Sequence, residues 1–221
     1  MILIIKDVLT ADQCDQIIED MAAMRFQPGT KTAGWHARLV KNNEQTDRMH
    51  RAYKPLSDRV SQAIQNSAEF RMACLPRHLT DLRFSRYREG MEYGSHVDDP
   101  LMAGVRSDIS FTLWLADPGS YDGGELVMEN TDGDASYKLG RGELIAYDST
   151  RLHRVSPVTR GERICAVGWA QSRVRDAAQR EILYELDIAR RALFERESKS
   201  REFDLISKAH ANLTRMWADG G

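Results

Sequence analysis

A series of short apolar or alternating runs, with no helical pattern between them, fills the middle of the chain and most limits its fold. Ile109, Phe111 and Leu113 recur at every second position, a period of two that is typical of a strand. Further runs follow at 125–128, 143–147, 152–155 and 163–169. Turn signals separate them at 117–119, 122–124, 132–134, 140–142 and 160–161, of which Asp-Gly-Gly at 122–124 favours a tight turn. Consecutive strands without intervening helices predict an antiparallel sandwich or barrel rather than parallel βαβ units.

Helical patterns flank this all-β middle on both sides. Thr10 and Gln13 have the spacing of a capping box, and apolar residues continue at helical intervals to about Met24. A second amphipathic pattern covers 47–68, and two more, within 173–221, predict a helical hairpin. The opening run Ile2–Ile5 is interpreted as a buried strand. We therefore expect an α+β chain with three segments: an N-terminal strand and helices at 1–78, a β domain at 79–172 and a C-terminal helical extension at 173–221.

Composition excludes several classes of protein. Lys and Arg total 31 against 33 Asp and Glu, a formal net charge of −2, so no bulk basic charge indicates a nucleic-acid or anionic membrane partner. The hydrophobic content of 42% is that of a globular protein. The opening apolar run is too short to span a membrane and lacks the layout of a secretion signal, which predicts a cytoplasmic protein. Widely separated Cys14, Cys74 and Cys165 predict reduced thiols rather than disulfides or a thiolate zinc site.

His96 and Asp98 form the first part of a candidate metal site. In an extended segment, residues two apart point to the same face, so the imidazole and the carboxylate converge. His153, in a later predicted strand, is the candidate third ligand of a two-His-one-carboxylate triad, which holds Fe(II) and leaves coordination positions free. With six histidines in the chain, a His-x-Asp or His-x-Glu triplet is expected roughly once by chance, so the triplet alone carries little weight.

Arg163 forms the second part of the candidate site. The loop at 156–161 is interpreted as a hairpin turn, and a hairpin centred near Val158 places Arg163 directly opposite His153. A guanidinium beside the metal suits the far carboxylate of a dicarboxylate whose near end chelates the metal. Each residue also has an ordinary interpretation, as a strand histidine, a turn histidine or a surface arginine. The pattern alone therefore leaves the metal site and the ordinary interpretation about equally open.

Longer motifs across the same region carry a resemblance to a known family. They occupy residues 87–98, 106–110, 121–126, 152–163 and 169–172. Through them the run 84–171 resembles the iron(II)- and 2-oxoglutarate-dependent dioxygenases of the prolyl and lysyl hydroxylase type, and more closely the bacterial PKHD-type hydroxylases. The opening strand and the helical tail also resemble that bacterial group, so the likeness extends over nearly the whole chain.

The resemblance implies a double-stranded β-helix, or jelly-roll, and assigns roles to particular residues. It places one catalytic Fe(II) at His96, Asp98 and His153. It implies that Arg163 pairs with the distal carboxylate of 2-oxoglutarate and that Tyr87 hydrogen-bonds this cosubstrate, although Tyr87 is equally open to interpretation as a packed strand aromatic. Arginine at position 163 agrees with the bacterial group, whereas animal-type prolyl hydroxylases typically have lysine there.

The implied reaction consumes 2-oxoglutarate and O2, forms succinate and CO2, and hydroxylates a C–H bond, with L-ascorbate as an auxiliary reductant. The resemblance does not choose the substrate among a free amino acid, a peptide or protein, and a small molecule. It implies a role in iron homeostasis only by analogy. A homo-oligomer stays open, because the C-terminal helices could cover the β domain, form a dimer interface or shape a substrate channel.

Three other functions compete with the hydroxylase. A non-catalytic cupin-like metal-binding or sensing module would use the same ligands, and 2-oxoglutarate binding would discriminate between the two. A zinc hydrolase would need a general base near the metal, and the sequence does not nominate one. A nucleic-acid demethylase is disfavoured because the resembling demethylases have a second arginine where this chain has Trp169.

Overall fold

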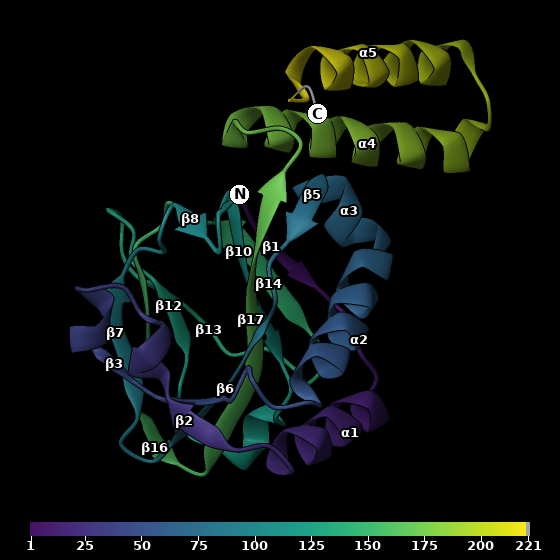
Figure 1. Ribbon diagram of the computed structural model, residues 1–221. Coiled ribbons are helices and arrows are strands. Elements are labelled where there is room, and N and C mark those ends of the chain that lie inside the picture. Colours follow the sequence, from purple (N-terminus) through teal and green to yellow (C-terminus); the bar gives the residue numbers. More distant parts are fainter. Residues whose placement is uncertain (220–221) are drawn as a thin grey trace.

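Two antiparallel sheets form the middle of the protein in the computed structural model, which describes residues 1–219 (Figure 1). Within these residues the larger sheet has eight strands in the order β1-β14-β10-β17-β6-β4-β2, and β5 pairs with β17 as well. Their bounds are β1 (Ile2–Ile5), β14 (Leu144–Asp148), β10 (Ile109–Trp114), β17 (Glu162–Ser172), β6 (Arg83–Arg88), β4 (Glu44–Thr46), β2 (Phe26–Pro28) and β5 (Pro76–Leu79).

The smaller sheet has five strands among the described residues, in the order β13-β12-β15-β7-β3. Their bounds are β13 (Ala135–Tyr137), β12 (Leu126–Met128), β15 (His153–Val155), β7 (Glu92–His96) and β3 (Lys41–Asn42). Two short ribbons pair β8 (Leu101–Met102) with β9 (Val105–Arg106) and β11 (Asp122–Gly123) with β16 (Val158–Arg160). The predicted antiparallel β middle is therefore confirmed.

β10 separates two hydrophobic cores, which explains why all of its residues are buried. Ile109, Phe111 and Leu113 pack with the N-terminal helices in one core. Trp114 points to the opposite face and belongs to the second core, which contains residues of both sheets. Because successive strand residues point to opposite faces, Ser110 and Thr112 lie on the same face as Trp114, and Thr112 lines a cavity between the sheets. These two polar residues explain the alternation seen in the sequence.

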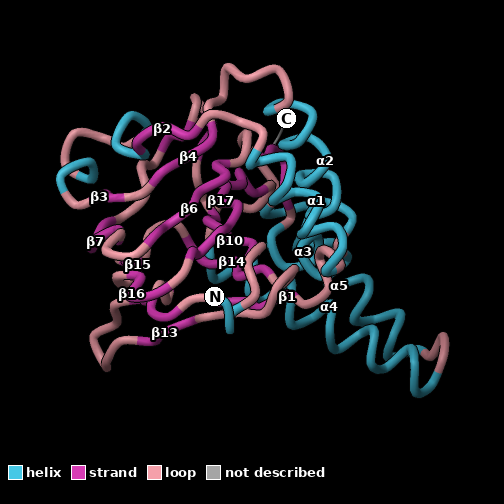
Figure 2. The backbone as a smooth tube through the Cα atoms, turned by 90° about the horizontal axis from the view of Figure 1, so that it is seen from below, coloured by secondary structure: helices cyan, strands magenta, loops and turns pink. Residues whose placement is uncertain are grey.

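Helices α1 (Ala11–Ala22), α2 (Tyr53–Asn66) and α3 (Ala68–Cys74) cover one face of the larger sheet. Figure 2 shows them gathered on one side of the strands. The capping box is confirmed, since Thr10 accepts from the backbone of Gln13 and the Gln13 side chain accepts from the backbone of Thr10. The prediction for 47–68 is wrong at its start, because residues 47–52 are turns. Sequence analysis also missed α3 and the short 3-10 helices η1 (Gly29–Thr32) and η2 (Ala37–Leu39). The 3-10 helix η3 (Pro118–Ser120) overlaps the turn predicted at 117–119.

The opening strand lies at the edge of the larger sheet rather than in its interior. β1 pairs only with β14 among the described strands, and the side chain of Ile4 is 40% exposed while Ile5 is buried. The predicted strand at Ile2–Ile5 is therefore confirmed, but its predicted burial is wrong, because an edge strand with one face on the core leaves alternate residues in solvent. The cysteine prediction is confirmed for all three thiols, which are buried and free.

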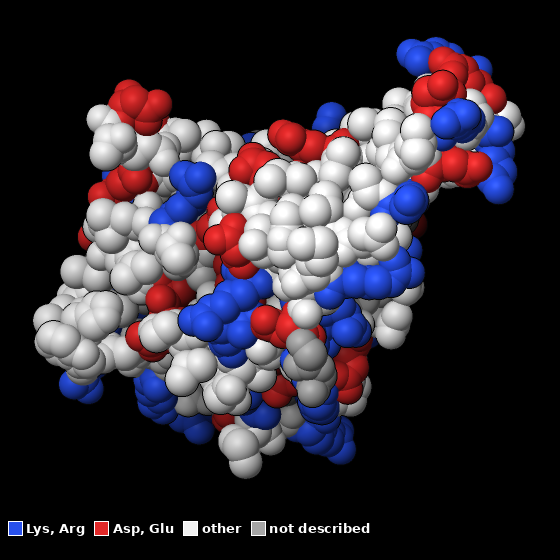
Figure 3. Space-filling view, turned by 90° about the horizontal axis from the view of Figure 1, so that it is seen from above, with Lys and Arg blue, Asp and Glu red and all other residues white. Residues whose placement is uncertain are grey.

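The C-terminal hairpin is confirmed as α4 (Ala177–Glu197) and α5 (Arg201–Trp217), which pack side by side (Figure 1). The buried guanidinium of Arg180, on α4, joins the hairpin to the sheet by donating to Oδ1 of Asp148 at 2.6 Å. The far end of the hairpin projects from the body and carries charges of both signs, including the Arg196–Glu197 pair (Figure 3).

The predicted boundaries at 78 and 172 remain a prediction. The larger sheet draws β1, β2 and β4 from the first predicted segment and its remaining strands, β5 included, from 76–172. Between residues 1 and 219, no helix is both long and apolar enough to cross a bilayer.

Candidate metal centre and cosubstrate pocket

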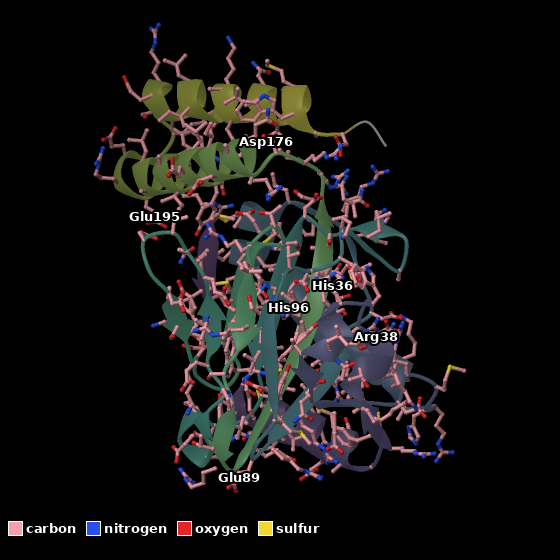
Figure 4. All side chains as sticks on the ribbon, turned by 90° about the vertical axis from the view of Figure 1, so that its left-hand side faces the viewer. His36, Arg38, Glu89, His96, Asp176 and Glu195 are labelled. Atoms are coloured by element: carbon pink, nitrogen blue, oxygen red, sulfur yellow. The ribbon has the colours of Figure 1, made fainter. Side chains whose placement is uncertain are left out.

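The three predicted metal ligands meet at one point in the smaller sheet. His96 ends β7, Asp98 follows two residues later, and His153 begins β15. β7 and β15 are antiparallel neighbours in which His96 and His153 are direct partners. Nε2 of His96 lies 4.0 Å from Oδ1 of Asp98, and Nε2 of His153 lies 3.9 Å from Oδ2. Figure 4 shows His96 in the interior of the protein. The imidazole of His96 and the carboxylate of Asp98 therefore converge, as their spacing in the sequence predicted.

Both imidazoles are fixed in the tautomer that suits a metal ligand. Nδ1 of His96 lies 2.8 Å from the carbonyl of Gly94, and Nδ1 of His153 lies 3.0 Å from the carbonyl of Arg151. Because a carbonyl only accepts, each Nδ1 carries a proton, and Nε2 is the ring nitrogen that faces Asp98 in both residues. Burial lowers the pKa of His96 to about 4, with a further contribution from His153, so its ring is neutral at pH 7. A neutral imidazole is the form that binds metal.

Asp98 and His96 are each held by a neighbouring side chain. The hydroxyl of Ser110, on β10, donates to Oδ2 of Asp98 at 2.5 Å and lies 2.8 Å from the hydroxyl of Ser149. The ring of Tyr93 stacks on His96 with centroids 3.6 Å apart. Such outer contacts orient metal ligands and usually raise metal affinity.

We expect Ser110→Ala to weaken Fe(II) binding by roughly 10–100-fold, because it removes the hydrogen bond that orients Asp98. Anaerobic Fe(II) titration of the purified protein measures this. Ser120→Ala is the matched control, since the hydroxyl of Ser120 bonds to the backbone of Asp117 on the exposed turn η3. Equal affinity of Ser110→Ala and the wild type would show that Asp98 is oriented without this hydroxyl.

Arg163 does not lie opposite His153, so the hairpin prediction is wrong. After Val155 the chain leaves the smaller sheet, forms β16 against β11, and enters the larger sheet as β17. The partner of Arg163 in register is Tyr87 on β6, whereas the partners of His153 are Met128 and His96. The expected turn at 122–124 likewise contains β11, paired with β16. The loop was long enough to change sheets, which turn signals alone do not reveal.

A cavity between the sheets nevertheless brings the predicted residues together. Its lining includes His96, Asp98 and His153 from the smaller sheet and Tyr87 and Arg163 from the larger one. Burial raises the pKa of Tyr87, so its hydroxyl keeps its proton and can donate to a ligand. All five residues predicted from the sequence therefore share one cavity, although their roles there remain a prediction.

Arg163 is a buried cation without a carboxylate partner among the described residues. Its side chain is 1% exposed, Nη1 contacts Sγ of Cys165 at 2.9 Å, and Nε has no hydrogen-bond partner. The guanidinium lies 5.0 Å from the ring centroid of Tyr87 and 5.3 Å from that of Trp114. Gly124 leaves room for it, since a Cβ there would lie 2.9 Å from Cδ of Arg163. Burying an unpaired charge is costly, so this site calls for an anionic ligand.

Sequence analysis missed several polar residues of the cavity. Asn43 is 4% exposed, and neither atom of its amide group has a hydrogen-bond partner. Lys41, Arg83 and Trp169 also line the cavity. Lys41 and Asn43 lie in or beside strands of two or three residues, which are too short to show a period, so no signal pointed to them. The sequence placed Trp169 in a strand and in a family motif but gave its side chain no role in a pocket.

Known proteins resemble the chain in sequence over its whole length. Residues 82–171 match the model of the 2OG-Fe(II) oxygenase superfamily. A PKHD-type hydroxylase of Crocosphaera subtropica is 49% identical over 222 residues, covering 99% of this chain and 100% of that protein. Another, of Acaryochloris marina, is 52% identical over 219 residues with the same coverage of both chains. The chain belongs to the PKHD-type hydroxylases.

This PKHD-type hydroxylase is accordingly a 2-oxoglutarate-dependent dioxygenase, an oxidoreductase, as the resemblance implies. Two solved structures share its fold. A Pseudomonas putida prolyl-4-hydroxylase superposes with a TM-score of 0.54 at 22% identity, over 78% of this chain and 92% of that one. A viral collagen prolyl hydroxylase from Paramecium Bursaria Chlorella virus-1, in its 2OG complex, gives a TM-score of 0.54 at 22% identity, over 77% and 96%.

The family implies Fe(II) and 2-oxoglutarate, and the residues of this PKHD-type hydroxylase fit both. Two imidazole nitrogens and one carboxylate are the donor set of a facial Fe(II) triad. The unpaired guanidinium of Arg163, in the same cavity, matches a carboxylate of the cosubstrate.

Proposed function

We propose that His96, Asp98 and His153 hold one Fe(II) per chain and that Arg163, assisted by Tyr87, holds 2-oxoglutarate. The two sheets would then be the halves of a double-stranded β-helix with this pocket between them. The protein would hydroxylate an amino acid, peptide, protein or small molecule, consuming O2 and forming succinate and CO2. The observation that carries the proposal is the buried, unpaired Arg163 in the cavity that the triad also lines.

The side chains of the pocket divide the work of binding and orientation. The iron, when bound, supplies the redox chemistry that decarboxylates 2-oxoglutarate and hydroxylates the substrate. Backbone carbonyls fix the two imidazoles, and Ser110 fixes Asp98, so the ligands need little rearrangement to bind. Arg163 and the protonated hydroxyl of Tyr87 offer donors to the cosubstrate. Burial of the site excludes water from the reacting groups.

Two further parts of the proposal rest on the family resemblance alone. L-ascorbate would act as an auxiliary reductant that returns stalled iron to Fe(II). A role in iron homeostasis would follow by analogy with the bacterial group. The domain limits 1–78, 79–172 and 173–221 and a homo-oligomeric state are likewise proposals.

Anaerobic addition of Fe(II) and then 2-oxoglutarate to the metal-free protein tests the proposed site. We expect the weak visible charge-transfer band of an iron-chelated 2-oxoglutarate. Iron binding without the band would contradict the cosubstrate site and favour a metal-binding module of the same fold. Failure of the folded protein to bind iron would overturn the triad.

A further inference from the structure

The pocket has a second cationic part along the larger sheet, away from Arg163. In the register of β6 and β17, Arg163 pairs with Tyr87 and Val167 pairs with Arg83. Arg83 is therefore four residues from Tyr87 on the same face of the strand, a backbone separation of about 13 Å. Both pairs line the cavity. We call the end near Arg83 the outer part of the pocket.

Lys41 reaches the same outer part from the smaller sheet. It is the register partner of Tyr93, and its Nζ lies 4.8 Å from the ring centroid of Tyr93 and 3.4 Å from Oγ1 of Thr32. Burial, together with the positive charge of Arg83, lowers the pKa of Lys41 to about 8, while Asp98 opposes the change. Two cations from different sheets therefore act on each other across one cavity.

Neither cation has a carboxylate partner within 4.0 Å in the described part of the chain. Asp81, the acidic residue nearest to Arg83 in sequence, forms its ion pairs with Arg48 and Lys54, and it acts on the pKa of Arg83 only from beyond ion-pair distance. Asp99, also on the lining, is exposed at the rim.

Other polar groups of the outer part are donors or are already occupied. Trp169 lines the cavity, and its buried indole N–H has no hydrogen-bond partner. Gln45 is already bonded, accepting from Thr32 and donating to Ser85. The side chains of lysine, arginine and tryptophan can only donate hydrogen bonds, because none of them has an acceptor atom. Lys41 contacts only a hydroxyl, and neither Lys41 nor Arg83 forms an ion pair with a carboxylate. Two such cations beside the free indole N–H, in a partly buried space, favour an anionic acceptor.

We propose that Lys41 and Arg83, together with the indole N–H of Trp169, form a subsite for an anionic group of the prime substrate. The anion is a carboxylate or a phosphate on the molecule to be hydroxylated, and it is distinct from the cosubstrate carboxylate at Arg163. This inference rests on the proposed function, since it assumes that iron and 2-oxoglutarate occupy the inner part of the pocket. It makes Lys41 and Arg83 specificity-determining residues.

Matched pairs of small probes test the subsite. The protein is loaded with Zn(II) in place of Fe(II) and saturated with 2-oxoglutarate, and probe affinity is measured by ligand-observed NMR. N-acetylglutamic acid α-amide is compared with N-acetylglutamine amide, and N-acetylphosphoserine amide with N-acetylserine amide. We expect the charged member of at least one pair to bind roughly tenfold or more tightly than its neutral partner. The pair with the larger preference identifies the anion as a carboxylate or a phosphate.

Variants that remove or preserve the two charges show whether Lys41 and Arg83 cause the preference for the charged probe. The double variant Lys41→Gln, Arg83→Gln should lose it, whereas Lys41→Arg, Arg83→Lys should keep most of it. Arg38→Gln is the matched control, because exposed Arg38 lies on η2, outside the cavity lining (Figure 4). Affinity for 2-oxoglutarate should stay within about twofold of the wild type in all of these variants.

Different outcomes would overturn different proposals. Equal binding within both probe pairs, or no binding by any probe, would overturn the anion subsite while leaving the iron and cosubstrate sites standing. A charge preference that survives in the double glutamine variant would also overturn it. Loss of 2-oxoglutarate binding in that variant would assign Lys41 and Arg83 to the cosubstrate instead. A wild type that does not bind 2-oxoglutarate would refute the proposed function itself.

Discussion

Asp98→Asn and His153→Ala are each expected to reduce iron-dependent turnover of 2-oxoglutarate at least roughly a thousandfold. Changes in outer contacts of a metal site usually cost about 10–100-fold, so loss of one of only three protein ligands should cost more. Asparagine keeps the shape of Asp98 but removes the negative charge that balances the cation. Succinate formation with added Fe(II), compared with Fe(II) affinity of the same samples, measures the effect.

The control for these variants is His78→Ala, which removes an exposed histidine from β5. It should bind iron and turn over 2-oxoglutarate like the wild type. Thermal unfolding of the metal-free proteins then separates a lost ligand from a lost fold. Normal turnover in either Asp98→Asn or His153→Ala would refute the proposed triad.

The parts of the fold that the sequence predicted correctly are those in which local pattern and tertiary burial agree. β10 alternates because Ile109, Phe111 and Leu113 pack on the helices, whereas Ser110 and Thr112 face Asp98 and the cavity on the other side. α1 begins at Thr10 because a capping box satisfies backbone groups locally, without help from the rest of the protein. His96 and Asp98 converge because their spacing alone sets a common face.

The wrong predictions concern pairings between segments distant in sequence. Whether β15 and β17 share a sheet is decided by which strands each one meets, and the local signal at 156–161 fits both a hairpin and a change of sheet. Lys41 reaches the pocket because β3, two residues long, pairs with β7 some fifty positions away. No period can be read from a strand of that length, so the sequence could not place Lys41 in the pocket.

A second large effect, on 2-oxoglutarate binding, is expected when Arg163 is replaced. Arg163→Met should weaken 2-oxoglutarate binding by roughly 100–1,000-fold, because a guanidinium–carboxylate pair in a buried site contributes charge-assisted, two-point hydrogen bonding. Fe(II) affinity should change little, since Arg163 is not a ligand. Anaerobic titration of the charge-transfer band measures 2-oxoglutarate binding, and a separate Fe(II) titration without 2-oxoglutarate measures iron affinity. The 2-oxoglutarate affinity of Arg163→Lys should lie between those of the wild type and Arg163→Met, because lysine keeps the charge and loses the planar guanidinium.

Arg180 supplies a contrast that tests why Arg163 is buried. Both guanidinium side chains are 1% exposed, but Arg180 pairs with Asp148, whereas Arg163 has no carboxylate partner among residues 1–219. Arg180→Met should therefore cost roughly 3 kcal/mol of the free energy of unfolding, by leaving Oδ1 of Asp148 unpaired. Arg163→Met should leave the stability of the ligand-free protein unchanged or raise it, because it replaces an unpaired buried charge with an apolar side chain. With both proteins already loaded with Fe(II), 2-oxoglutarate at a hundred times the wild-type Kd should add about 2.7 kcal/mol to the wild type and less than about 0.5 kcal/mol to Arg163→Met. Equal ligand stabilisation in both proteins would show that the cosubstrate does not pair with Arg163.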